Sequence, residues 1–203
     1  MNILAIGAHP DDIEYGVGGT IAKLVRAGHN VTFLILTYGE TIGDPNVRKQ
    51  EAIDGAKALG VKNVLFGNLK DSFIKHDKET IDIIERVIAK VKPDRIYTIY
   101  VEDSHQDHRN TALSTISAGR DTPSIIFYEC PSVFSNNFNP HLFVDITDTI
   151  QNKFDALKVH VSQNKKSFMD MSAIEGLAKF RGFQTRMKIK YAEAFHIFRH
   201  LEY

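Results

Sequence analysis

Short apolar runs alternate with stretches of helical spacing along this chain, and this alternation limits the folds open to it. Five runs are predicted to be buried strands, because they are short, apolar and rich in β-branched residues. These runs are Asn2–Ile6, Val31–Leu36, Asn63–Phe66, Arg95–Tyr100 and Ile125–Tyr128. Strands that alternate with helices predict an α/β fold of three layers, with a Rossmann-like, doubly wound and mostly parallel sheet between two layers of helices.

The helical stretches have clear predicted ends. One apolar face of helical period ends before Gly28, a second before Gly60 and a third before Pro93. Gly or Pro directly after such a repeat is a typical helix stop. The crossovers between the first four strands are therefore predicted to be helices.

The last third of the chain changes character. Val144–Ile146 and Tyr191–Phe198 are predicted strands, and the residues between them carry helical signals. Thr147 is predicted to cap one helix, and Ser172 with Glu175 has the spacing of a capping box for another. No linker, repeat or low-complexity tract divides the chain, so we expect one domain over residues 1–203.

Charge and cysteine content exclude several classes of protein. Lys+Arg and Asp+Glu both total 25 and no basic stripe is visible, which argues against a nucleic-acid partner. The single cysteine, Cys130, cannot form an internal disulfide, which indicates a reducing compartment. Met1–Ala8 is too short and lacks the basic leader of a signal peptide, and no run approaches the ~20 apolar residues of a membrane span. We expect a cytoplasmic protein.

Two dense polar clusters follow the first and fourth predicted strands. The first is GAHPDDIE, Gly7–Glu14, and the second is Glu102–His108. In a sheet of strand order 3-2-1-4-5, strands 1 and 4 are neighbours, and ligands bind in the crevice beyond their carboxyl ends. The two clusters are therefore expected to face each other.

The residue types in these clusters suit a catalytic zinc. Zinc takes imidazole nitrogens and carboxylate oxygens where cysteine is absent, and a catalytic zinc has three protein ligands and one open position. His9, Asp12 and one of the pair His105 and His108 supply that set. The residues alone leave the choice between the two histidines open.

Neighbouring side chains could perform the proton transfers. Asp11 could act as a base towards a water whose pKa the metal lowers. The histidine that does not bind the metal could stabilise an oxyanion or protonate a leaving amine, with Asp107 to orient it.

The first cluster and the glycines after it could also serve roles that need no catalytic metal. Asp residues ahead of a helix could simply cap it, because carboxylates accept N–H bonds from the first turn. The Gly16–Thr20 stretch could form a phosphate-binding turn of a nucleotide- or cofactor-binding module without hydrolase activity. That stretch lacks the GxGxxG spacing and follows an acidic cluster, so close helix packing is favoured. A metal-stabilised interaction domain without activity is a third alternative.

HPDDIE, His9–Glu14, and HQDH, His105–His108, resemble the two signature motifs of the LmbE-like (PIG-L) de-N-acetylases. These zinc enzymes remove acetyl groups from N-acetylglucosamine-type sugars. Further similarity, for example at Arg48–Glu51 and Tyr191–Phe195, extends over nearly the whole chain to the bacterial branch, which includes bacillithiol-pathway deacetylases. The resemblance implies a zinc-dependent deacetylase that releases acetate, assembled as a trimer or hexamer.

The resemblance also assigns roles to single residues. It implies that Zn²⁺ is held by His9, Asp12 and His108, that Asp11 is the general base, and that His105 is an acid or oxyanion stabiliser. It further implies that Arg48 and Asp71 contact the substrate. From the residues alone, Arg48 could equally be a solvated helix-start residue paired with Glu51, and Asp71 a turn or capping residue. The group attached to the sugar is expected to be recognised by the loops Gly39–Asn46 and Ser132–Pro140.

Overall fold

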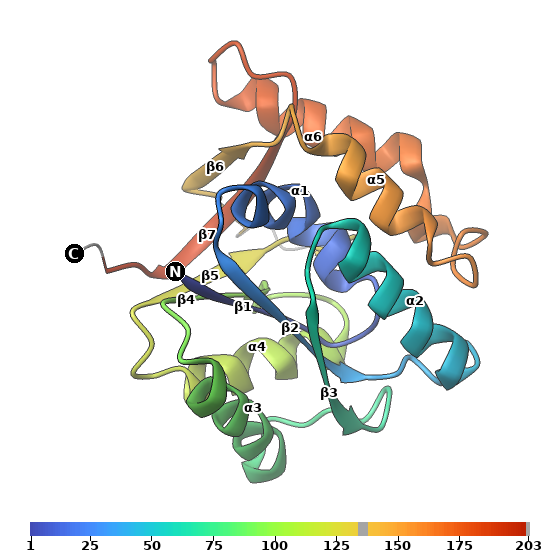
Figure 1. The fold of residues 1–203 in the computed structure, drawn as a ribbon, viewed down its shortest axis with the longest axis vertical. Coiled ribbons are helices and arrows are strands. Elements are labelled where there is room, and N and C mark those ends of the chain that lie inside the picture. The colour runs from blue at the N-terminus through green and yellow to red at the C-terminus, as the bar shows by residue number, and fades with distance from the viewer. Residues whose placement is uncertain (134–137, 202–203) are drawn as a thin grey trace.

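A seven-stranded sheet covered by helices on both faces forms the core of the structure, a computed structural model that describes residues 1–133 and 138–201 (Figure 1). The strands lie in the order β3-β2-β1-β4-β5-β7-β6. Their bounds are β1 Asn2–Gly7, β2 Asn30–Thr37, β3 Asn63–Leu69, β4 Arg95–Ile99, β5 Ser124–Tyr128, β6 Leu142–Asp145 and β7 Ala192–Arg199. The first five strands are parallel, and β7 is antiparallel to both β5 and β6. The predicted α/β fold and the predicted order 3-2-1-4-5 are confirmed.

The helices are divided between the two faces of the sheet. Figure 1 shows α1, α2 and α5 over one face and α3 and α4 over the other. Their bounds are α1 Asp12–Arg26, α2 Pro45–Ala58, α3 Lys78–Val91, α4 Gln106–Ala118, α5 Ile150–Lys158 and α6 Met171–Gln184, with a short 3-10 helix, η1, at Ser167–Met169. Within the described residues, none of these helices has the length and apolar character needed to cross a membrane.

The predicted helix stops are present in the backbone. Gly28 and Gly60 adopt φ values of 82° and 84°, the left-handed conformation that glycine adopts at little cost. Lys92, directly before Pro93, ends α3 with a φ of 49°. These turns return the chain to the sheet for the next parallel strand.

The predicted caps of the last two helices are wrong. The N-cap of α5 is Thr149 rather than Thr147. At α6 the Asp170 carboxylate accepts hydrogen bonds from the backbone N–H groups of Ser172 and Ala173, so Ser172 lies inside the helix. An aspartate two residues earlier offers a charged acceptor, which satisfies the exposed N–H groups better than a serine hydroxyl.

The sequence pattern also does not single out α4. Its buried face contains Thr111, Ser114 and Thr115 beside Ala112, so it lacks the aliphatic repeat by which the other helices are recognised. The Thr115 hydroxyl donates to the carbonyl of Thr111, which satisfies it within the helix.

A buried ion pair joins the C-terminal third to α1. Glu193 on β7 accepts hydrogen bonds from the backbone N–H groups of Gly19 and Thr20, at 3.0 and 2.7 Å. Lys153 of α5 donates to the same carboxylate at 2.7 Å. Because both charged side chains are buried, removal of either one would leave an uncompensated charge at a cost of about 3–5 kcal/mol. Strand β7 and helices α5 and α1 therefore pack together as one unit.

The glycines of Gly16–Thr20 serve close packing inside α1. A Cβ atom at Gly16 would lie 2.0 Å from the ring of Tyr128, and one at Gly19 would lie 2.8 Å from Ile146. These positions are in the middle of the helix rather than in a turn before it. The helix-packing interpretation is therefore confirmed over the phosphate-binding turn.

We expect Gly16→Ala to lower the free energy of unfolding by about 1–3 kcal/mol, because the added methyl group overlaps a buried ring. The Tyr128 ring cannot move away freely, since its hydroxyl donates to the carbonyl of Ile6 at 2.8 Å. Urea unfolding measures the change. Gly176→Ala in α6 is the matched control, because a Cβ there meets no atom within 4 Å. The control is expected to stabilise the protein by about 0.5–1 kcal/mol, and equal midpoints for the two variants would contradict the packing argument.

Candidate active site

A pocket of about 210 Å³ lies at the carboxyl ends of the central parallel strands. Its walls include His9 after β1, Thr41 after β2, Asp71 after β3, and His105 and His108 after β4. This is the edge at which ligands bind in doubly wound sheets. The two polar clusters predicted to face each other do so here.

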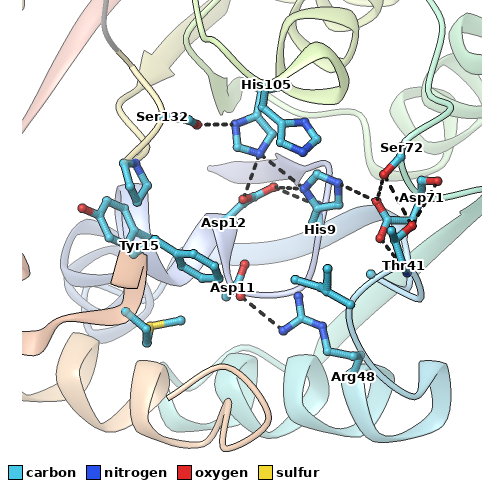
Figure 2. Close-up of a pocket in the computed structure, with 16 residues that line it drawn as sticks. His9, Asp11, Asp12, Tyr15, Thr41, Arg48, Asp71, Ser72, His105 and Ser132 are labelled. Atoms are coloured by element: carbon cyan, nitrogen blue, oxygen red, sulfur yellow. Dashed lines mark hydrogen bonds and ion pairs between the residues drawn. The ribbon is translucent and has the colours of Figure 1, made fainter. Parts of the chain in front are cut away.

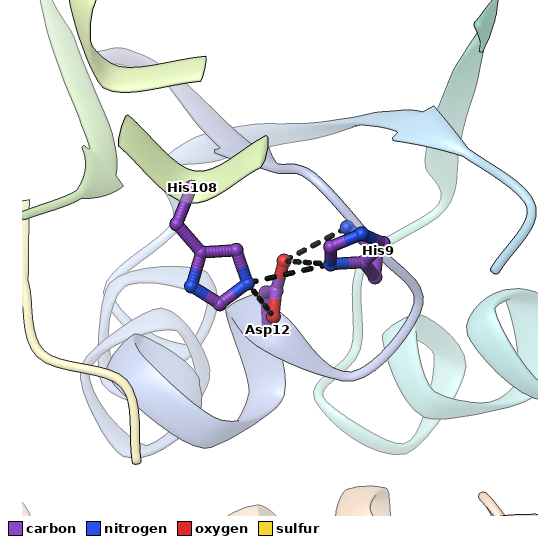
Figure 3. A group of neighbouring side chains, drawn as sticks. All are labelled: His9, Asp12 and His108. Carbon is purple, nitrogen blue, oxygen red and sulfur yellow. Dashed lines mark hydrogen bonds and ion pairs between the residues drawn. The ribbon is translucent and has the colours of Figure 1, made fainter. Parts of the chain in front are cut away.

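His9, Asp12 and His108 converge on one point of this pocket (Figure 3). Nδ1 of His9 lies 3.3 Å from Nε2 of His108. The Asp12 carboxylate lies 3.3 Å from the same nitrogen of His108 and 3.6 Å from Nδ1 of His9. Each residue thus presents one possible ligand atom to a common centre.

The opposite nitrogen of each ring faces a carboxylate. Nε2 of His9 lies 3.2 Å from both Asp71 and Asp107, and Nδ1 of His108 lies 3.0 Å from Asp103. A carboxylate only accepts, so these outer nitrogens carry the protons and the inner nitrogens can offer lone pairs. Two imidazole nitrogens and one carboxylate oxygen are a donor set that zinc takes in catalytic sites. The three residues therefore fit a divalent metal ion.

The turn before α1 aims Asp11 into the pocket instead of using it as a cap. Asp11 is at the N-cap position with a φ of 100°, and its side chain makes no capping hydrogen bond. Asp12 accepts from the backbone N–H groups of Ala8 and His9, at 3.0 and 2.8 Å, and so holds the turn. A left-handed conformation is costly for a non-glycine residue and is typical of functional sites.

Arg48 of α2 is buried against Asp11, as Figure 2 shows. Its side chain is 1% exposed, and its two terminal nitrogens donate to Asp11 at 3.2 Å and to the Pro10 carbonyl at 2.8 Å. The solvated helix-start interpretation is therefore wrong. Burial raises the pKa of Asp11 even though Arg48 opposes the shift. Arg48 fixes the position of this carboxylate.

His105 is held by a backbone group rather than by a carboxylate. Its Nδ1 accepts from the N–H of Asp107 at 3.2 Å, so the ring proton lies on Nε2. The Asp107 carboxylate, expected to orient His105, instead faces His9 and accepts from the N–H groups of Ser72 and Ile74. Burial, and repulsion from His108 and His9, lower the pKa of His105.

Asp71 lines the pocket and joins two loops. One carboxylate oxygen contacts His9, and the other accepts from the N–H of Thr41 at 3.0 Å. Burial alone would raise the pKa of Asp71, but these contacts outweigh it and lower the pKa. These contacts join Asp71 to residues far away in the sequence, so its role extends beyond the local turn or cap that the sequence alone indicated.

Several residues around the site are not singled out by the sequence. Asp103 lies in the second cluster, five residues before His108, and that position is the one signal that could have identified it. Ser132, 3.2 Å from His108, has no such signal. Residues 134–137 of the Ser132–Pro140 loop lie outside the part of the chain that the structure describes.

Glu14 does not take part in the turn that precedes α1. Its side chain is fully buried, and Oε1 lies 3.4 Å from Nε2 of His160. His160 is brought there by the segment after α5, so no local pattern indicates the pair. Together they form a polar contact between the N-terminal helix and the C-terminal third.

The fold and this pocket define a class of three-layer α/β proteins with a candidate metal centre at the carboxyl edge of a mostly parallel sheet. The chain belongs to the PIG-L family, whose model, described as GlcNAc-PI de-N-acetylase, matches residues 4–118.

Curated relatives agree with this membership. The chain is 33% identical to "Uncharacterized deacetylase YaiS" of Escherichia coli (strain K12), covering 79% of this chain and 90% of that protein. It is 28% identical to a "Probable N-acetyl-alpha-D-glucosaminyl L-malate deacetylase 2" of Bacillus cereus, covering 85% and 88%. It is 30% identical to "Diacetylchitobiose deacetylase" of Thermococcus kodakarensis, covering 79% and 69%.

Solved structures share the fold closely. N,N'-diacetylchitobiose deacetylase from Pyrococcus horikoshii superposes with a TM-score of 0.84 at 25% identity, covering 96% of this chain and 82% of that one. GalB, a 4-carboxy-2-hydroxymuconate hydratase from Pseudomonas putida, gives 0.86 at 21% identity, covering 100% and 99%. Because a hydratase shares the architecture, the fold does not by itself decide the reaction.

We expect Asp103→Asn to weaken zinc binding by about 10–100-fold, because the variant loses the carboxylate that orients His108. Competition with a chromophoric chelator measures the affinity. Asp148→Asn, at an exposed position, is the control and should bind zinc as the wild type does. Unchanged affinity in Asp103→Asn would show that His108 does not depend on this partner.

Zinc binding is also expected to release protons at neutral pH. Burial lowers the pKa of His108, but Asp12 and Asp103 raise it to about 9, and carboxylates likewise raise the pKa of His9. Zinc binds only unprotonated imidazole nitrogen, so these protons must leave, and the affinity should rise as the pH increases towards the pKa of His108, about 9. Calorimetric titrations in two buffers of different ionisation enthalpy count the protons. Binding without proton release would contradict the raised pKa values.

Proposed function

We propose that the protein is a zinc-dependent hydrolase that removes the acetyl group from an N-acetylglucosamine-type amino sugar or its glycoside. The convergence of His9, Asp12 and His108 beside the Asp11 carboxylate is the observation that carries this proposal. A metal site next to a buried carboxylate is suited to the hydrolysis of an unactivated amide, because the metal can polarise the carbonyl while the carboxylate accepts a proton from water. Membership of the PIG-L family points to the same reaction.

His9, Asp12 and His108 would hold the metal, and the carboxylates of Asp71, Asp107 and Asp103 would orient the two histidines. When bound, zinc supplies Lewis-acid polarisation of the acetamide carbonyl and a water of lowered pKa.

Asp11 is the proposed general base. Its carboxylate lines the pocket and is held by Arg48, so it can accept a proton as the water oxygen attacks the carbonyl carbon. The C–N bond then breaks, the nitrogen takes up the proton that Asp11 accepted from water, and acetate and the free amine are the products. Arg48 keeps the base in place during both proton transfers.

His105 is the proposed stabiliser of the tetrahedral oxyanion. Its Nδ1 is occupied by the N–H of Asp107, which leaves Nε2–H as the donor of a ring that lines the pocket. A fixed donor aimed at developing negative charge lowers the barrier without reorganisation. Asp107 thus serves both histidines, through its backbone towards His105 and through its carboxylate towards His9.

Arg48 and Asp71 both line the pocket, as substrate-binding residues must. In this proposal their main contacts are to Asp11 and His9, and sugar hydroxyls are secondary partners.

The substrate class is supported by two relatives, named as a probable N-acetyl-alpha-D-glucosaminyl L-malate deacetylase and as a diacetylchitobiose deacetylase. Both substrates contain an acetylated amino sugar. The nucleotide-binding alternative loses its structural basis, since the glycines on which it depended pack inside α1. A single domain over residues 1–203, a cytoplasmic location and assembly as a trimer or hexamer stay predictions.

We expect Asp11→Asn to lower kcat for acetate release by about 10²–10⁴-fold, because an amide cannot take the proton from water. The assay measures acetate from N-acetylglucosamine and its α-glycosides with zinc-loaded protein. Zinc content should be unchanged, since Asp11 is outside the proposed ligand set, and Asp148→Asn should keep full activity. Full activity in Asp11→Asn would exclude Asp11 as the base.

A further inference from the structure

A chain of polar groups runs from the Asp11 carboxylate to the segment that follows α5. Nη1 of Arg48 donates to Asp11 at 3.2 Å and lies 4.0 Å from a carboxylate oxygen of Glu51, one turn further along α2. Ser162 occupies both oxygens of Glu51, because its backbone N–H donates to one at 2.7 Å and its hydroxyl to the other at 2.6 Å. Helices α2 and α5 pack side by side (Figure 1), and Glu51 links segments 111 residues apart.

The turn after α5 fixes the direction in which Ser162 donates. Nε2 of Gln163 donates to the Ser162 hydroxyl at 2.9 Å, so the hydroxyl hydrogen points to Glu51. Gln163 is fully buried, and its backbone N–H donates to the carbonyl of His160 at 2.8 Å. Hydrogen bonds aligned in this way polarise and strengthen one another. The Glu51 carboxylate is thus held in one place by a structured turn.

The Arg48 side chain is enclosed along its length. A Cβ atom at Gly39 would lie 2.8 Å from its Nε, so the loop before α2 packs directly on it. Its guanidinium has oxygen neighbours from Asp11, from the Pro10 carbonyl and from Glu51, whose side chain is also buried. A buried guanidinium depends on such negative neighbours for its position. Of these three, only Glu51 lies outside the turn that carries the proposed base.

The proposed metal ligands do not depend on this chain of contacts. Asp12 holds its own turn, since it accepts from the backbone N–H groups of Ala8 and His9. Glu51 and Ser162 are not among the residues that line the pocket. A change at either position should therefore move Arg48 and Asp11 and leave metal binding as it is.

We propose that Glu51 and Ser162 are positioning residues of the reaction. They hold the Arg48 guanidinium, and through it the Asp11 carboxylate, where Asp11 can accept a proton from water. The inference rests on the proposed deacetylase function, in which Asp11 is the base. It gives the turn after α5 a part in the reaction without contact to substrate or metal. A displacement of about 1 Å at a reacting group can cost about 100-fold in rate, so even a partial loss of this support is measurable.

The first test changes Glu51 to a side chain of the same size without charge. Glu51→Gln should lower kcat for acetate release from N-acetylglucosamine by about tenfold and change KM by less than about twofold, because Asp11 acts in the chemical step. Zinc content should be unchanged in metal analysis of the purified protein.

The second test removes the hydroxyl that holds Glu51. Ser162→Ala should lower kcat by about threefold, since the backbone N–H of Ser162 still donates to Glu51. Ser162 is exposed, so its truncation leaves no buried cavity. This variant decides the question even if urea unfolding shows that Glu51→Gln does not fold.

Each variant has a matched control away from the pocket. The exposed Ser172 hydroxyl also donates to a carboxylate, that of Asp170, at 2.7 Å, so Ser172→Ala matches Ser162→Ala. Glu175 accepts from the Tyr191 hydroxyl at 2.6 Å, so Glu175→Gln matches Glu51→Gln. Neither Ser172 nor Glu175 lines the pocket, and both controls should keep the kcat of the wild type.

A double-variant cycle separates positioning from a general structural role. If Glu51 acts through Asp11, Glu51→Gln should cause no further loss of kcat in a protein that already carries Asp11→Asn. A purely structural role would lower kcat by the same factor in both backgrounds.

The outcomes distinguish this inference from the function on which it rests. Wild-type kcat in the folded variants, a loss of activity explained by lost zinc, or equal factors in the two backgrounds would overturn the inference while deacetylation stands. If the zinc-loaded wild type releases no acetate from N-acetylglucosamine or its α-glycosides, the proposed function is overturned and the inference with it.

Discussion

Parallel pairing of β1 with β4 is the constraint on which the site depends. Leu4 lies opposite Ile96 and Ala5 opposite Tyr97, so the two strands end at the same edge. The helices that follow them, α1 and α4, cover opposite faces of the sheet (Figure 1). The segments that follow β1 and β4 therefore diverge at this edge, and the two polar clusters meet in the crevice between them. A change of strand partner would separate His9 from His108 entirely.

The site is held together by the carboxylates that surround His9 and His108. Asp71 and Asp107 fix the ring of His9, and Asp103 fixes the ring of His108. The segments that carry these carboxylates are thereby coupled to the two rings. Such buried carboxylates are costly unless each has a donor, and here Thr41, Ser72 and Ile74 supply backbone N–H groups. Much of the polar surroundings therefore serves orientation, and few groups are left for proton transfer.

The sequence predicts what depends on local pattern and strand order. Short apolar runs identify the strands, and doubly wound topology then brings His9 and the His105–His108 pair together. It does not predict contacts made by distant loops, such as the burial of Arg48 against Asp11 or the pair of Glu14 with His160. The direction of the Asp107 carboxylate also escapes prediction, because it depends on side-chain rotation at the start of α4, where His9 competes with His105 as a partner. The resemblance to a family supplies roles, but these orientations depend on tertiary contacts that no local pattern encodes.

The Glu193 carboxylate supports α1, which begins at the site, yet Glu193 is synthesised near the end of the chain. It accepts hydrogen bonds from Gly19 and Thr20, and 173 residues separate Thr20 from Glu193. At translation rates of about 5–20 residues per second, Glu193 is synthesised roughly 10–35 s after Thr20. The turn that holds His9 and Asp12 directly precedes α1, so its final support arrives near the end of translation.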